Sequence, residues 1–133
     1  MTTGLDSFDE FSWASLLAGS EALVVDADRR RAMRTASALE TAGARATLAP
    51  DAATALDRLL RRRFSLAVLA LDLDGQIEAR LGEALASQDI RLVLLADPAR
   101  HEALRRTHPG AAVAAIGLGE RALVMLLTGT KDE

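Results

Sequence analysis

Five short apolar runs alternate with five amphipathic helical segments, and this alternation constrains the fold more than any other feature of the sequence. The runs are residues 22–27 (ALVVDA), 44–49 (ARATLA), 64–71 (FSLAVLAL), 91–96 (RLVLLA) and 111–116 (AAVAAI). FSLAVLAL is typical of a central parallel strand that is buried on both faces, whereas the weaker ARATLA is expected at an edge. Five βα units predict right-handed crossovers and a doubly wound α/β fold around a five-stranded parallel sheet.

The helical segments are marked by apolar spacing and by capping residues. The first covers residues 29–42, is stopped by Gly43, and has one side formed by Met33, Ala36 and Leu39. The second has apolar positions at Ala52, Ala55, Leu56, Leu59 and Leu60, and the third at Ile77, Leu81, Ala84 and Leu85. The fourth starts at Pro98, and ERALVMLL (residues 120–127) forms the last. The predicted N-caps are Asp28, Asp51 and Asp97.

Length and composition limit the classes of function. The 133 residues suffice for about one domain with a substantial core. A net charge of -3 argues against nucleic-acid binding, and the arginine clusters at residues 29–31, 61–63 and 105–106 are interpreted as solvated helix ends. The absence of Cys excludes disulfides and thiolate chemistry. Because no transmembrane-length apolar run and no signal-peptide pattern occur, a cytoplasmic protein that does not bind membranes is expected.

Residue patterns that are typical of enzymes are missing from the sequence. It contains no Ser-His-Asp arrangement, no Gly-rich phosphate loop and no HExxH motif. His101 and His108 lie on or near the fourth helix without a third ligand, so surface positions are favoured over a metal site. We therefore expect neither catalytic activity nor a cofactor.

One acidic turn follows the first strand, at a position where α/β proteins bind ligands. Asp26 and Asp28 flank Ala27 there, and the carboxyl ends of parallel strands are where ligands and metals are held. Asp28 is predicted to cap the first helix. Asp26 is either a weak cation ligand or a carboxylate that caps the helix or faces solvent, and the second interpretation is favoured.

The segments LVVDAD, FSLAVLALDLDG, LVLLADP and AAVAAIG, in this order and with helices between them, resemble the receiver domain of bacterial two-component response regulators. The resemblance covers roughly residues 21–128. It implies a flavodoxin-like sheet with the strand order 2-1-3-4-5 and a pocket at the carboxyl ends of strands 1, 3, 4 and 5.

The resemblance also implies positions for the chemistry of the family, and most of them carry unsuitable residues. The acidic pair that holds Mg²⁺ would be Asp26 and Ala27. The phosphoacceptor would be Ala70, the hydroxyl residue Ala96, and the lysine Ile116. We therefore expect a degenerate receiver, or pseudo-receiver, that binds no metal tightly and acts without phosphorylation as a protein–protein interaction module in signal transduction.

Two alternatives remain open from the sequence. Asp72 lies two residues beyond Ala70, on the same face of an extended strand, so it is a fallback phosphoacceptor in an atypical receiver. The other alternative is a small-molecule sensor, with a ligand at the strand carboxyl ends in the space left by Ala27, Ala70 and Ala96.

Two apolar segments predict an interaction surface. Residues 1–19 are expected to form an N-terminal helical arm that precedes a receiver-like domain of residues 20–133. The arm is expected to dock through Leu5, Phe8, Phe11, Trp13 and Leu16. The last helix is apolar all round, so Val124, Leu126, Leu127 and their neighbours are not all expected to face the sheet. The arm and this helix together predict a protein partner or a homodimer, with neither nucleic acid nor membrane as a partner.

Overall fold

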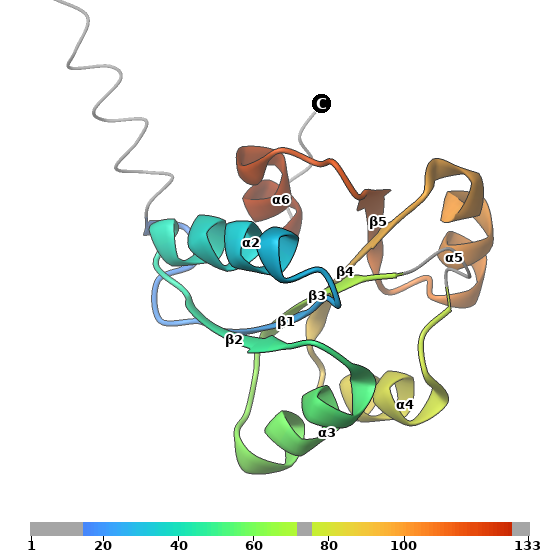
Figure 1. The fold of residues 1–133 in the computed structure, drawn as a ribbon, viewed down its shortest axis with the longest axis horizontal. Helices are drawn as coiled ribbons and strands as arrows, with labels where there is room; N and C mark the ends of the chain where they lie inside the picture. Colours follow the sequence, from blue (N-terminus) through green and yellow to red (C-terminus); the bar gives the residue numbers. More distant parts are fainter. Residues whose placement is uncertain (1–14, 72–75, 129–133) are drawn as a thin grey trace, which may run out of the picture.

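The computed structural model describes residues 15–71 and 76–128, which form a sheet covered by helices on both faces (Figure 1). The strands are β1 (Glu21–Val25), β2 (Arg45–Ala49), β3 (Leu66–Ala70), β4 (Arg91–Ala96) and β5 (Ala112–Ala115). Within the described ranges they form one five-stranded, all-parallel sheet in the order β2-β1-β3-β4-β5. The doubly wound α/β architecture and the strand order 2-1-3-4-5 are thereby confirmed.

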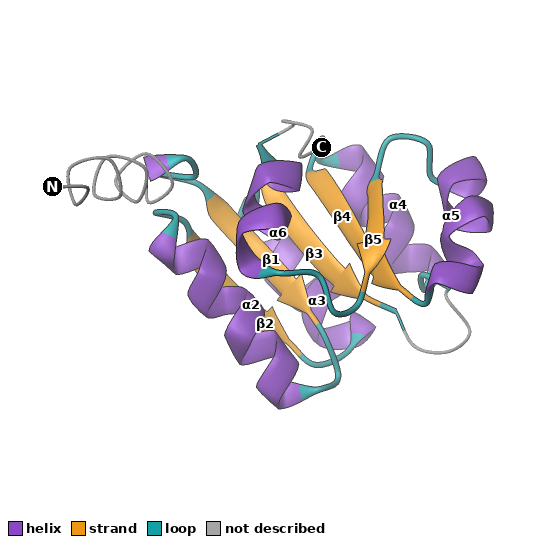
Figure 2. Cartoon of the chain, turned by 90° about the horizontal axis from the view of Figure 1, so that it is seen from above, coloured by secondary structure: helices purple, strands orange, loops and turns teal. Residues whose placement is uncertain are grey.

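The helices divide into two layers. One face of the sheet is covered by α2 (Arg29–Thr41) and α6 (Glu120–Leu127). The other face is covered by α3 (Ala52–Arg61), α4 (Ala79–Ser87) and α5 (His101–Thr107), and a 3₁₀ turn, η1 (Pro98–Arg100), leads into α5 (Figures 1 and 2). Each layer closes its own apolar core against the sheet.

The burial of the strands follows their apolar character. The central strands β1, β3 and β4 are apolar over most of their length, and most of their residues are buried. In contrast, β2 and β5 lie at the edges and keep half-buried or exposed positions. The edge position of ARATLA and the central position of FSLAVLAL are both confirmed. Because all strands run in parallel, their carboxyl ends meet at one edge of the sheet.

The predicted capping residues all accept hydrogen bonds from helical N–H groups. Asp28 accepts from the N–H of Arg31 at the start of α2, and Asp51 accepts from the N–H of Thr54 at the start of α3. Asp97 caps η1 through the N–H of Ala99. These bonds satisfy N–H groups that have no partner within the helix. The N–H donors lower the pKa of the Asp28 and Asp51 carboxyl groups.

The buried faces of two helices differ from the predicted ones. On α2 the sheet is met by the small residues Ala32, Thr35 and Ala38 together with Leu39, while Met33 is 54% exposed. The contact face is therefore rotated by about one position, because short side chains let the helix lie close to the sheet. On α3, Leu60 is 87% exposed. It lies next to the last residue of the helix, on a side that no other element covers.

The expectation that α6 presents an exposed apolar patch is wrong for the described part of the chain. Val124 and Leu127 are almost fully buried in the core on the α2 side of the sheet, and Leu126 is half-buried against the same core. The reason is geometric. The helix lies beside α2 as well as over the sheet, so its apolar positions are covered from two directions (Figure 1).

The segment before β1 is attached to the domain at its end. The side chain of Leu17 is buried in the same core as α2, and its N–H donates to the carbonyl oxygen of Ala42 over 2.9 Å. Leu16, one of the predicted interface residues, is exposed. The other predicted arm residues, Leu5, Phe8, Phe11 and Trp13, lie outside the described residues. No helix in the described ranges has the length and apolar character needed to span a membrane.

Candidate functional site at the carboxyl edge of the sheet

The residues singled out from the sequence meet at the edge where the parallel strands end. Asp26 and Ala27 directly follow β1, and Ala70 and Ala96 are the last residues of β3 and β4. Ile116 follows β5. The fold therefore brings together the five positions at which the receiver resemblance expects functional groups. Asp72, the fallback phosphoacceptor, lies outside the described residues.

The dominant feature of this edge is a buried ion pair between Asp26 and Arg31. The guanidinium donates from Nε to Oδ2 of Asp26 over 2.7 Å and from Nη2 to Oδ1 over 2.8 Å. The backbone N–H of Asp28 donates to the same Oδ1 over 2.9 Å. The Asp26 side chain is only 2% exposed, and that of Arg31 is 27% exposed. Both oxygens of Asp26 are therefore occupied by donors from within the chain.

The pair has the bidentate geometry of a strong salt bridge, in which one guanidinium binds both carboxylate oxygens. Two parallel N–H···O bonds from one guanidinium fix both distance and orientation, and charged partners shorten the bonds. The hydrogen bond to Asp26 raises the pKa of Arg31 further above its usual range. Asp26 is not the solvated carboxylate that the sequence favoured, because it is buried and faces a guanidinium, although it accepts the N–H of Asp28 just before α2.

The three alanines of the edge do not share one cavity. Ala27 is exposed and Ala70 is half-buried, and both line a hollow of about 210 Å³ beside β1 and β3. Ala96 is fully buried in the core on the α3, α4 and α5 side of the sheet and does not line that hollow. The single ligand cavity expected from Ala27, Ala70 and Ala96 together is therefore absent from the described part of the chain.

Among the described residues, the donor set at this edge does not fit a divalent metal ion. Three carboxylates line the 210 Å³ hollow, from Asp26, Asp51 and Glu78. Asp26 is bound by Arg31, Asp51 caps α3, and Glu78 caps α4 by accepting from the N–H groups of Arg80 and Leu81. Mg²⁺ requires several oxygen ligands in near-octahedral geometry. Among the described residues no cluster of three or more His, Cys, Asp or Glu side chains is placed to hold a metal.

The two histidines have structural positions. His101 is half-buried, and its Nε2 lies 2.9 Å from the carbonyl oxygen of Ala96. Because a carbonyl can only accept, this nitrogen carries the proton and ties the start of α5 to the end of β4. His108 is half-buried at the end of α5. Within the described ranges neither joins a group that could bind a metal.

Arg31 is the functional residue that the sequence interpretation missed. The sequence predicts a solvated helix end at residues 29–31, whereas Arg31 turns inward and pairs with the buried Asp26. A signal for this role was present, because three arginines in the first turn of a helix are unfavourable next to the positive end of the helix dipole. Such a cluster is stabilised when acidic residues lie directly before it, and Asp26 and Asp28 occupy those positions.

Comparisons of the structure with solved structures give a consistent result. A CheY-like response regulator receiver domain protein from Methanospirillum hungatei superposes with a TM-score of 0.68 at 18% identity, covering 83% of this chain and 91% of that one. The chemotaxis response regulator CheY4 of Vibrio cholerae gives 0.68 at 16% identity, with 83% and 97% covered. The chain has the CheY-like receiver fold. A response regulator from Burkholderia pseudomallei with a phosphorylated aspartic acid, a calcium ion and citrate gives 0.69 at 21% identity, with 81% and 66% covered.

Sequence comparisons add no family to the receiver fold. No protein-family model matches the sequence, and no curated protein matches it. The structural likeness at these identities shows the receiver fold alone, so the chemistry of the site rests on the residues of this chain.

Proposed function

We propose that this receiver-fold domain is a pseudo-receiver, a non-enzymatic protein–protein interaction module of bacterial signal transduction that works without phosphorylation. The observation that carries the proposal is the buried, bidentate pair of Asp26 with Arg31. The proposed location is the cytoplasm, where two-component signalling domains act.

The ion pair removes the carboxylate that a receiver would use for its metal. A cation that entered the site would have to displace the guanidinium of Arg31 and leave that charge without its partner. Losing one member of a buried pair costs several kcal/mol. Asp26 is therefore proposed as a structural carboxylate, and Arg31 as the positive charge that neutralises it.

The neighbouring positions support the same proposal. In the Burkholderia pseudomallei protein the aspartic acid is phosphorylated and a calcium ion is present. The receiver resemblance places Ala70 at the acceptor position of this chain, and a methyl group cannot form an acyl phosphate. Ala96 and Ile116 offer neither a hydroxyl nor a positive charge for a phosphoryl group, and burying such a charge without partners is costly.

Phosphorylation chemistry gives the direct test. With acetyl phosphate and Mg²⁺ the intact protein should show no mass increase, and with beryllofluoride and Mg²⁺ its amide spectrum should not change. Both reagents act on a carboxylate, so Asp72 is the residue to control. If the protein forms a stoichiometric adduct that disappears in Asp72→Ala, it is an atypical phosphoacceptor receiver and the pseudo-receiver proposal is wrong.

The partner is proposed to be a protein, either a second copy of this chain or a signalling protein. The proposed contact surface is the N-terminal segment before Leu17 together with the exposed side of Leu126, since Val124 and Leu127 are buried. A pull-down from the native host with the full chain as bait identifies a heterologous partner. Light scattering over a range of concentrations detects a homodimer.

A further inference from the structure

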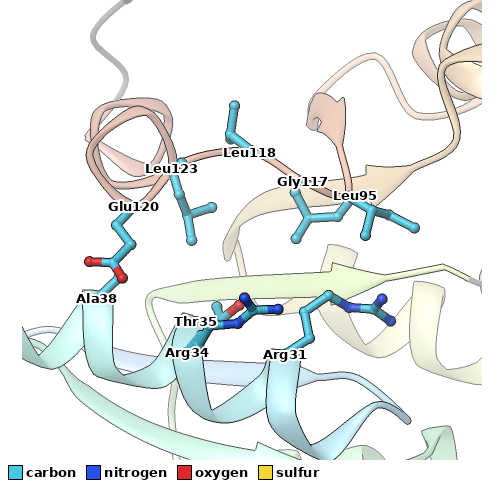
Figure 3. Close-up of a pocket in the computed structure, with 11 residues that line it drawn as sticks. Arg31, Arg34, Thr35, Ala38, Leu95, Gly117, Leu118, Glu120 and Leu123 are labelled. Atoms are coloured by element: carbon cyan, nitrogen blue, oxygen red, sulfur yellow. The ribbon is translucent and has the colours of Figure 1, made fainter.

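A second pocket lies beside the carboxyl edge, on the α2 and α6 side of the sheet. It measures about 270 Å³ and is enclosed by α2, by the end of β4 and by the loop from β5 into α6. Figure 3 shows Arg31 and Arg34 on α2 along one wall and Leu123 of α6 pointing toward them from the opposite wall, while the side chain of Leu118 points away from α2. This pocket is separate from the hollow lined by Ala27 and Ala70.

Around this pocket one positive group forms no salt bridge within the described ranges, although it is close enough to Asp28 to help lower the pKa of that carboxyl group. Arg31 is neutralised by Asp26. Arg34 is exposed and forms no salt bridge with any residue in the described ranges. Glu120 reaches from α6 toward Ala38 at one end of the pocket (Figure 3). Glu120 is exposed, and its negative charge opposes a multiply charged anion more than a singly charged one, so the pocket favours a ligand with a single negative charge.

A hydroxyl that opens into the pocket adds a second polar contact beside Arg34. Thr35 lines the pocket on the turn of α2 next to Arg34, and it is only 8% exposed. Its hydroxyl has no hydrogen-bond partner among the described residues, and it is not one of the fully buried unsatisfied atoms, so it is open to the pocket. Pockets orient their ligands through a few polar groups of this kind. A ligand oxygen accepting from Thr35 would supply that partner.

The start of α6 adds further donors on the opposite wall. The N-cap is Gly119, and no side chain caps this helix, although carboxylates cap α2, α3 and α4. The first N–H groups of a helix attract negative charge through the helix dipole. Hydrogen-bond donors therefore lie on both sides of the pocket: Arg34 and Thr35 on α2, and the first N–H groups of α6 on the other side.

The rest of the lining is apolar and determines the body of the ligand. It consists of Ala38, Leu95, Ile116, Leu118 and Leu123. The volume is just below the range of roughly 300–1,000 Å³ that is typical for drug-sized ligands. We propose that this pocket binds a small organic monoanion, with its carboxylate at Arg34 and Thr35 and its single apolar ring or short chain against the leucines.

Benzoate is a suitable probe, with benzamide as the neutral compound of the same shape and inorganic phosphate as the anion without an apolar body. Binding to the full-length protein is measured from the shifts of backbone amide signals. Benzoate should shift the amides of Thr35 and residues 117–120 in a saturable way. Benzamide and phosphate should each bind at least about tenfold more weakly, because each lacks one of the two features.

Three substitutions separate binding from folding. Arg34→Gln should weaken benzoate binding by about tenfold or more, whereas Arg30→Gln, on the exposed side of the same helix, should leave it unchanged. Thr35→Val should weaken binding, because it removes the hydroxyl and keeps the shape of the side chain. Glu120→Gln should strengthen binding, because it removes the opposing charge.

Each other outcome would overturn the proposal. If benzamide binds as tightly as benzoate, the pocket recognises only the apolar body. If phosphate binds as tightly, the pocket is a general site for inorganic anions. If neither Arg34→Gln nor Thr35→Val changes the affinity for benzoate, the carboxylate does not bind at Arg34 and Thr35. The absence of saturable shifts with benzoate would show that the pocket binds no anion of this class.

Discussion

Removing Asp26 and removing Arg31 should not destabilise the fold equally. Asp26 is buried almost completely, so without Arg31 its charge would remain in a poorly solvated position, where the one donor left among the described residues is the N–H of Asp28. Arg31 is 27% exposed, so without Asp26 its guanidinium can reach water. The arginine is therefore the more costly member of the pair to remove.

This asymmetry predicts the effect of single substitutions. Arg31→Gln should lower the free energy of unfolding by about 2–3 kcal/mol, somewhat below the cost of breaking a fully buried pair. Asp26→Asn should cost less. Urea unfolding followed by circular dichroism measures both, and Arg30→Gln serves as the control because that arginine is exposed and forms no ion pair within the described ranges. Equal losses for Arg30→Gln and Arg31→Gln would contradict a stabilising role of the pair.

At the residue scale, the sequence is sufficient to predict a contact when its two groups are close along the backbone. The caps at Asp28, Asp51 and Asp97 were predictable, because a cap bonds to an N–H two or three residues away. The partner of Asp26 was not, because a long arginine side chain at residues 29–31 can point to solvent or to the strand end. Only the packing of α2 on the sheet decides between Arg29, Arg30 and Arg31.

Among the elements, the helices depart from prediction where size rather than hydrophobicity decides which face is buried. The sheet accepts Ala32, Thr35 and Ala38 of α2 and leaves the larger Met33 outside. A spacing rule that counts apolar residues favours Met33, because it does not represent the distance between helix and sheet. The same rule overestimated the free surface of α6, since it took no account of the neighbouring α2.

The burial of α6 predicts a difference between two leucines. Leu127→Ala should lower the free energy of unfolding by about 3 kcal/mol, because the side chain is almost fully buried. Leu60→Ala should change it by less than about 0.5 kcal/mol, because that side chain is exposed. Chemical denaturation of both variants makes the comparison. A neutral Leu127→Ala variant would place this residue at an interface rather than in the core.

The cap of α3 predicts a pH dependence of stability. Because the N–H of Thr54 lowers the pKa of Asp51 in the fold, its contribution is fully present above its unfolded pKa of about 3.9 and is lost as pH falls through the lowered value. Asp51→Asn keeps an accepting oxygen without titrating. Its thermal midpoint should therefore fall less steeply in acid than that of the wild type, whereas the exposed Glu83→Gln should follow the wild-type curve. If the thermal midpoints of Asp51→Asn and the wild type fall equally steeply in acid, the titration of Asp51 does not contribute to the pH dependence of stability.

For the whole molecule, the order of apolar runs and helices was enough to predict the sheet. A continuous apolar run such as FSLAVLAL requires cover on both faces, and a weak run such as ARATLA is tolerated only at an edge. The pocket between α2 and α6 was not predictable in this way. Its lining residues come from segments as far apart as Arg34 and Glu120, and their approach depends on the tertiary packing.

Because Leu17 is attached to the domain, the residues before it can be deleted without disturbing the core. Deleting residues 1–14 keeps Leu17 and its bond to Ala42, so the thermal midpoint should stay close to that of the full chain. If the segment is the proposed contact surface, this deletion should lower the mass seen by light scattering or abolish partner binding. In a matched variant of the full chain, Leu17→Ala should instead cost about 2–3 kcal/mol of stability. A truncated protein with unchanged mass and partner binding would mean that residues 1–14 are not the contact surface.

The distance along the chain between Asp26 and Arg31 has a consequence for the setting in which the domain works. A dissolved ion occupies a site in proportion to its free concentration, so its occupancy changes when the medium changes. A guanidinium five residues away from its carboxylate is a tethered counterion, whose effective concentration is set by the length of the chain between them. No chelator can remove it, and added salt screens it little because the carboxylate is buried. If the pseudo-receiver proposal holds, the charge of Asp26 should therefore stay neutralised whatever the supply of divalent ions.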